Sequence, residues 1–193
     1  SLLRRGRGRA TRYALAREGA GVGSLVPLYE IDRDGQPMLV GRLRPLSGRA
    51  WCFEQDDPWE TLRGQEFPDG LYPDLPWFVD DLRPQGFLGR AFAHAYAEGL
   101  GLSPDPRTWK ADDVVLALLR HGRDLQGGFV LGEAMLAEAQ SRKLSGVSAL
   151  PAMSRSTTYV TMAASALAGE WPGSSAAGEQ PKFTACVRDE DGT

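Results

Sequence analysis

The sequence has 193 residues, of which 42% are hydrophobic and 24% are charged, a composition typical of a soluble globular protein with one large or two small domains. No apolar run approaches the roughly 18 residues that a membrane-spanning helix needs. The arginine-rich beginning also lacks the apolar core of a secretory signal, so we expect no membrane partner.

The cysteines and the charge distribution limit the choice further. Cys52 and Cys186 are far apart and match no metal-binding spacing, so we expect a reducing, cytoplasmic location and no metal site. The net charge of −3 is unevenly distributed, because residues 1–24 carry six arginines and one glutamate, a charge of +5 that leaves −8 for the rest. The sequence opens inside a patterned segment and stops at a turn, and we interpret it as a fragment.

Two short apolar segments within residues 2–15 flank a Gly-Arg-Gly turn, a pattern that predicts a β-hairpin with a basic tip. Its arginines suit contacts with a DNA phosphate backbone, and they are Arg4, Arg5, Arg7, Arg9 and Arg12. Such a hairpin resembles the wing of a winged helix-turn-helix domain, so residues 1–18 are interpreted as a wing remnant and residues 19–24 as a glycine-rich linker. A solvated basic arm is the alternative.

Apolar alternation and turn signals predict a small sheet after the linker, followed mainly by helices. Strands are expected at residues 25–31, 37–43, 51–53 and 127–131, and helices from Pro76 and at residues 87–97, 111–120, 133–143 and 154–167. The predicted fold class is therefore α+β, a small antiparallel β subdomain with helices. The aromatic residues between Trp51 and Phe78 are expected to be core. The acidic patch at residues 54–57 is interpreted as a solvated loop.

The stretch at residues 171–183 has a composition suited to phosphate binding. Pro172 ends the preceding helix, and the next six positions hold only small residues. Backbone N–H groups, serine hydroxyls and a lysine can converge there on an anion. The predicted nucleotide-binding residues are Gly173, Ser174, Ser175, Gly178 and Lys182. Residues 183–187 alternate as a strand does and residues 189–192 predict a turn, whereas an ordinary surface linker is the alternative.

Residues 174–183 resemble the Gly-rich loop of the HipA family of bacterial serine/threonine kinases, in particular its YjjJ-like branch. In that family the loop covers the ATP phosphates, and autophosphorylation of a loop serine ejects the loop and switches the kinase off. The resemblance implies that Ser175 is the autophosphorylated serine, with Ser174 as the second candidate. No Gly-Lys-Ser/Thr sequence closes the loop, so it is not a Walker A motif.

A second resemblance covers residues 75–86 and Arg90, which are similar to the Leu-Pro-x-Phe…Asn-Leu-Leu-Pro-Glu-Gly…Arg signature of the HipA N-terminal subdomain. Asp81 replaces the usual asparagine and Gln85 the usual glutamate. The segment at residues 121–124 has the wrong spacing for a kinase catalytic loop and precedes the Gly-rich loop, so we do not assign it that role.

These resemblances imply the N-terminal part of a HipA-like toxin kinase, with the N-terminal subdomain at residues 25–112 and the start of a kinase-like N-lobe at residues 113–193. They imply ATP and Mg²⁺ as cofactors of the full-length protein, DNA as a partner and a protein substrate such as an aminoacyl-tRNA synthetase. No catalytic aspartate or metal-binding pair is recognised, so we expect this fragment to be inactive. The alternative is a DNA-binding transcription regulator or antitoxin-like module without kinase activity.

Overall fold

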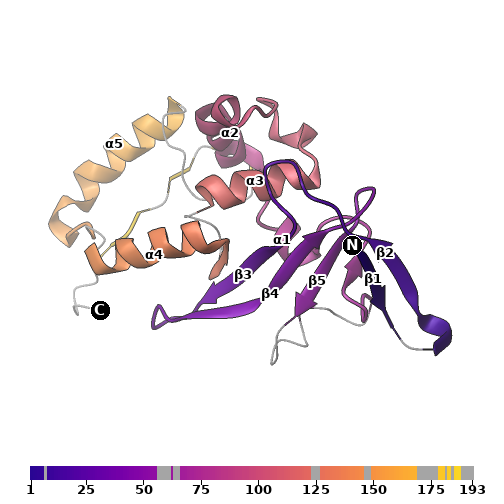
Figure 1. The fold of residues 1–193 in the computed structure, drawn as a ribbon. Helices are drawn as coiled ribbons and strands as arrows, with labels where there is room; N and C mark the ends of the chain where they lie inside the picture. Colours follow the sequence, from indigo (N-terminus) through magenta and orange to yellow (C-terminus); the bar gives the residue numbers. More distant parts are fainter. Residues whose placement is uncertain are drawn as a thin grey trace.

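The computed structural model describes residues 1–6, 8–55, 62, 66–122, 127–145, 149–168, 178–180, 182–183 and 185–187. Within these residues the protein combines antiparallel sheet with α-helices, which is the α+β class (Figure 1). In the same part of the chain, no helix has the length and apolar character to cross a membrane.

A five-stranded antiparallel sheet, in the order β6-β5-β4-β3-β7, forms the centre of the fold. Its strands are β3 (Val26–Ile31), β4 (Pro37–Pro45), β5 (Trp51–Gln55), β6 (Leu71–Tyr72) and β7 (Phe129–Leu131). Four of them confirm predicted strands, whereas the two residues of β6 are too few to show an alternating pattern. β7 reaches the sheet by pairing with β3, with Leu131 opposite Leu28.

Helices α1 (Trp77–Asp80) and α3 (Ala111–His121) lie on one face of this sheet, and α2 (Gly86–Leu100) packs on α3 in the same layer of the core (Figure 1). The side chains buried between helices and sheet include Leu28, Leu43, Trp51, Phe53, Tyr72, Phe78, Phe92, Val114 and Leu118. The prediction of an aromatic core is wrong for Trp77, whose side chain is 52% exposed. It is confirmed for Trp51, Phe53, Tyr72 and Phe78, which are 3% exposed or less. Burial of each such side chain stabilises the fold by about 1.5 to 3 kcal/mol.

Two further helices follow β7. Helix α4 (Glu133–Ser145) packs on the other side of the β3–β7 pair, where Val130 and Leu136 contact Tyr29 and Ile31. The hydroxyl of Tyr29 donates a hydrogen bond to the carboxylate of Glu133. Helix α5 (Arg155–Leu167) comes after the short 3-10 helix η4 (Ala152–Ser154) and lies to the side of the sheet in Figure 1.

The N-terminal hairpin is confirmed: β1 (Leu2–Arg5) pairs with β2 (Arg12–Leu15), and the 3-10 helix η1 (Gly8–Ala10) forms its tip. The segment that follows is fixed to the sheet and to α3. The guanidinium of Arg17 contacts both carboxylate oxygens of Asp112, at 2.6 and 2.7 Å, and donates to the carbonyl oxygen of Leu46 at 2.7 Å.

The stretch predicted as a linker forms a tight turn in which Gly19 and Gly23 form a β-bridge. Val22, inside this turn, is 8% exposed and belongs to the main core. The predicted domain boundary between residues 112 and 113 falls inside α3.

The strand predicted at residues 183–187 is not a continuous strand in the described residues. Val187 forms an isolated parallel bridge with Leu150, whose N–H donates to the carbonyl oxygen of Cys186 at 2.9 Å. The turn predicted at residues 189–192 lies outside the described residues.

Candidate functional site

The motif at residues 75–86 is anchored in the core. Four of its five large apolar side chains, Leu75, Phe78, Val79 and Leu82, are 7% exposed or less, whereas Trp77 is 52% exposed. Arg83 donates to the carboxylate of Asp80 at 2.6 Å and to the carbonyl oxygen of Trp109 at 2.9 Å, which ties α1 to the segment before α3. Asp81 and Gln85, the two departures from the family signature, are both exposed and therefore do not alter the core.

This motif ends at Gly86, where α2 begins, and there it touches the end of the Gly-rich stretch. Gly86 has a φ of +64°, and a Cβ at this position would lie 2.4 Å from the carbonyl oxygen of Gly178. The same oxygen accepts a hydrogen bond from the N–H of Phe87 at 2.8 Å. The first N–H groups of a helix have no acceptor within it, so the loop supplies the acceptor for this one.

Charged side chains surround the contact. Arg90 of α2 forms an ion pair with Glu179, 89 positions further along the sequence. The two side chains are 55% and 73% exposed, so the pair contributes at most about 1 kcal/mol. Lys182 lies close to Gly178, because a Cβ on that glycine would stand 2.6 Å from the lysine Nζ. The end of the loop is therefore near the positive end of the α2 dipole and the ammonium of Lys182, which favour a phosphate group, whereas the charge of Arg90 is balanced by Glu179.

A hollow of about 460 Å³ lies between α5 and the segment that carries Lys182. Its lining is apolar apart from the lysine and consists of Ala163, Ala166, Leu167, Lys182 and Phe183. The ring of Phe183 packs against Tyr159 of α5 with centroids 5.7 Å apart. The volume lies within the roughly 300 to 1,000 Å³ of ordinary small-molecule sites.

The structure locates only part of the predicted nucleotide-binding set. Gly178 and Lys182 come together at the start of α2, whereas Gly173, Ser174 and Ser175 lie outside the described residues.

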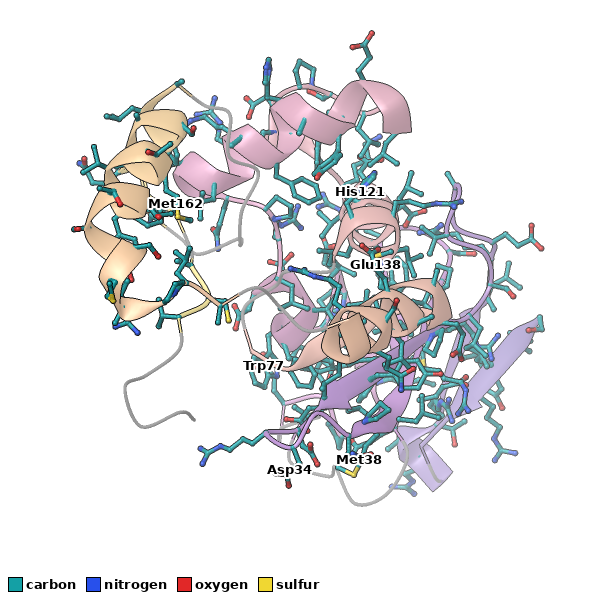
Figure 2. The ribbon with its side chains drawn as sticks, turned by 90° about the vertical axis from the view of Figure 1, so that its left-hand side faces the viewer. Asp34, Met38, Trp77, His121, Glu138 and Met162 are labelled. Carbon is teal, nitrogen blue, oxygen red and sulfur yellow. The ribbon has the colours of Figure 1, made fainter. Side chains whose placement is uncertain are left out.

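The two histidines of the sequence, one of them in the segment at residues 121–124, lie in different surroundings. His121 stacks on Tyr96 with ring centroids 4.0 Å apart, and Figure 2 shows it at the end of α3. His94 is exposed on α2, and Asp124 lies outside the described residues. Among the residues whose positions are described, no group of three or more His, Cys, Asp and Glu side chains could hold a metal ion.

One of the predicted DNA-binding arginines is engaged within the protein. Arg5 lies 3.1 Å from the carboxylate of Glu54, which also accepts a hydrogen bond from Arg44 at 2.9 Å. Arg5 also donates to the Sγ of Cys52 at 3.6 Å, and burial raises the pKa of that thiol. Arg5 therefore holds the hairpin on the sheet.

The remaining hairpin arginines differ in their surroundings. Arg12 lies 3.7 Å from Asp69, whereas Arg4 and Arg9 are exposed, and Arg7 lies outside the described residues. The hairpin also exposes large apolar side chains: Leu2 (66%), Tyr13 (63%) and Leu15 (55%).

Comparison with known proteins identifies the family. The family model described as the YjjJ-like toxin middle domain matches residues 22–140, which include the whole five-stranded sheet and helices α1 to α3. The chain belongs to the YjjJ-like toxin family. Toxin YjjJ of Escherichia coli (strain K12) is 36% identical over 183 residues, which are 95% of this chain and 39% of the relative. No solved structure matches the chain.

Membership of the YjjJ-like family confirms the predicted likeness to YjjJ-like proteins. The match at residues 22–140 runs without a break across the boundary predicted at residue 112, as α3 does. The chain spans about two fifths of the length of the toxin it matches, so it corresponds to part of such a protein.

Proposed function

We propose that this chain is part of a HipA-like toxin serine/threonine kinase, in which it supplies the Gly-rich loop and the domain that anchors the end of that loop. The observation that carries the proposal is the contact between the two motifs of the resemblance. The carbonyl oxygen of Gly178 caps the start of α2, directly after the motif at residues 75–86. A surface linker without a function would have no reason to meet the other motif of the same family at a glycine with positive φ.

In this proposal the loop holds the phosphates of ATP. Its backbone N–H groups and the ammonium of Lys182 supply positive potential, and small side chains allow the backbone to approach the phosphates closely. Mg²⁺, when bound, would neutralise phosphate charge, and its protein ligands are expected in the part of the full-length protein that this chain does not cover. The substrate is a protein, such as an aminoacyl-tRNA synthetase, and the site of action is the cytoplasm.

Regulation follows from charge at the loop. A phosphate on Ser175, or on Ser174, adds about −1.5 to −2 charges where the ATP phosphates would lie, so repulsion disfavours the closed loop. Ser175→Ala should therefore abolish autophosphorylation and leave ATP binding nearly unchanged. Ser175→Asp should weaken ATP binding, but less than the phosphate does, because it adds a single charge.

The experiment is phosphoryl transfer from labelled ATP with Mg²⁺, followed by mapping of the modified residue. The full-length protein should become labelled on Ser175, and its Ser175→Ala variant should remain unlabelled. The 193-residue chain should remain unlabelled. A full-length protein that neither binds ATP nor becomes labelled would contradict the kinase proposal and favour the antitoxin-like or regulator alternative.

The hairpin supports a second proposed activity, which is DNA binding by a winged helix-turn-helix domain. The wing of such a domain packs one face on helices and presents basic residues to the phosphate backbone. The exposed Leu2, Tyr13 and Leu15 offer an apolar face for such helices, with Arg4 on the same face opposite Tyr13, and Arg9 at the tip offers a further exposed cation. The clamp between Arg17 and Asp112 fixes the hairpin to the middle domain, so both activities would belong to one rigid unit.

A further inference from the structure

Helix α5 buries one side and leaves the other side without cover in the described structure. Met162 and Ala166 are 9% and 1% exposed, and Figure 2 shows Met162 on the side of α5 that faces the rest of the molecule. Ala163, next to them, lines the hollow beside Lys182. This side accounts for the attachment of α5 to the protein.

The opposite side carries a regular stripe of exposed residues. Val160 and Leu167 of α5 are both 71% exposed and lie seven positions apart, and Met153, 98% exposed, lies seven positions before Val160 in the 3-10 helix η4 that leads into α5. Thr157 and Ala164, also exposed, stand between them, so the stripe repeats at alternating steps of four and three residues. This is the spacing of the a and d positions of a helix that packs lengthwise against another element. Single exposed apolar residues are ordinary, but a stripe with this spacing indicates an interface.

The position of α5 in the chain indicates which surface covers it. The middle domain of the family matches residues 22–140, and α5 begins after that match. A domain described as the middle one has neighbours in the full-length protein, and the relative is much longer than the matched part. The stripe therefore lies in the segment that leads from the middle domain toward the rest of the toxin.

We propose that this stripe is the intramolecular docking surface of α5 for the domain that follows the middle domain in the full-length toxin, and that its occupant is an apolar surface of that domain. A second copy of the chain is a poorer occupant. Stable interfaces between separate proteins bury about 1,200 to 2,000 Å², more than two heptads of one helix can supply. Within one polypeptide the tether raises the effective concentration, so a small apolar stripe suffices. The inference depends on family membership and does not depend on kinase activity.

Hydrogen exchange of residues 155–167 tests this proposal. In the full-length protein their backbone amides should exchange at least tenfold more slowly than in the 193-residue chain, because docking suppresses local opening. In the full-length protein with the double substitution Val160→Asp/Leu167→Asp, the amides of residues 155–167 should exchange as fast as they do in the 193-residue chain. The unfolding temperature of the 193-residue chain should not change with the same substitutions, since both side chains are already in water.

Thr161→Asp is the matched control, because Thr161 is exposed on the same helix but lies outside the stripe. It should leave the protection in the full-length protein intact. Equal exchange of wild-type α5 in the two proteins would overturn the proposal. Protection that increases with protein concentration, together with a dimer mass in sedimentation, would also overturn it, because a second copy would then be the occupant.

Discussion

A side chain on Gly86 would collide with the backbone of Gly178: a Cβ would lie 2.4 Å from the carbonyl oxygen, 2.8 Å from the nitrogen and 2.9 Å from the carbonyl carbon of that residue. Glycine at position 86 thus permits a backbone-to-backbone approach that any side chain there would prevent without a shift. Gly86 is the last residue of the core-anchored motif at residues 75–86. Gly178 is the last of the six small residues of the Gly-rich stretch. This approach is the physical basis for assigning both motifs to one site.

The variant Gly86→Ala tests the approach directly. Alanine at a φ of +64° costs about 1 to 2 kcal/mol, and the collision with Gly178 adds to this cost. We expect lower stability in thermal unfolding and faster hydrogen exchange of residues 178–187. Gly99→Ala in the same helix is the control: a Cβ there meets nothing within 4 Å, so it should stabilise the helix by about 0.5 to 1 kcal/mol. Equal stability of wild type and Gly86→Ala would contradict the close approach.

The Arg17–Asp112 clamp gives a second prediction. The side chains are 27% and 18% exposed, and Arg17 donates hydrogen bonds to the carboxylate and to the carbonyl oxygen of Leu46. Arg17→Gln should therefore lower the free energy of unfolding by about 2 kcal/mol. Arg49→Gln is the matched control, since Arg49 is 77% exposed in its ion pair with Asp74 and should contribute less than about 1 kcal/mol. Denaturant titration measures the free energy of unfolding of both variants. Similar losses in the two would show that the Arg17–Asp112 clamp stabilises the protein no more than an exposed ion pair does.

The contact between Tyr29 and Glu133 predicts a pH dependence. Burial, and then the hydrogen bond to the Glu133 carboxylate, raise the pKa of Tyr29 to about 12. The unfolded chain binds fewer protons than the folded protein between about pH 10 and pH 12, so this contribution to stability is present below pH 10 and is lost as the pH rises toward 12. Absorbance titration of the phenolate should show a late-titrating tyrosine that Tyr29→Phe removes and that Glu133→Gln shifts to lower pH. A titration curve that Tyr29→Phe leaves unchanged would rule this out.

The sequence predicted helices and strands more successfully than it predicted contacts between segments that are far apart in the chain. Apolar periodicity located α2 to α5 and strands β3 to β5, because those segments carry several turns of a helix or several pairs of alternating residues. The motif ending at Gly86 was recognised, but its contact with Gly178 was not, since nothing in either segment encodes the position of the other. The same holds for Arg17 and Asp112, since Arg17 stood in the predicted wing remnant and Asp112 in a predicted helix 95 residues away. At residues 183–187 the alternation predicted a strand, whereas in the described residues Val187 forms a single bridge with Leu150.

The hairpin predicts a difference among its arginines. If the hairpin is a DNA-contacting wing, Arg4→Ala and Arg9→Ala in the full-length protein should each reduce the slope of log affinity against log salt concentration by about 0.9. Arg5→Ala should leave that slope unchanged and should lower stability, because Arg5 is paired with Glu54. Equilibrium DNA binding at several salt concentrations measures both effects. If all three variants keep the wild-type slope, the hairpin does not contact the DNA backbone and the alternative of a solvated basic arm holds.

The central claim is that the start of α2 anchors the Gly-rich loop of a nucleotide-binding kinase, and ATP affinity of the full-length protein tests it most directly. Calorimetry should show that Gly86→Ala binds ATP at least about fivefold more weakly than wild type, since a loss of about 1 kcal/mol in loop anchoring corresponds to that factor. Gly99→Ala should bind ATP as wild type does. Absence of ATP binding in the wild type, or equal affinity of wild type and Gly86→Ala, would contradict the claim.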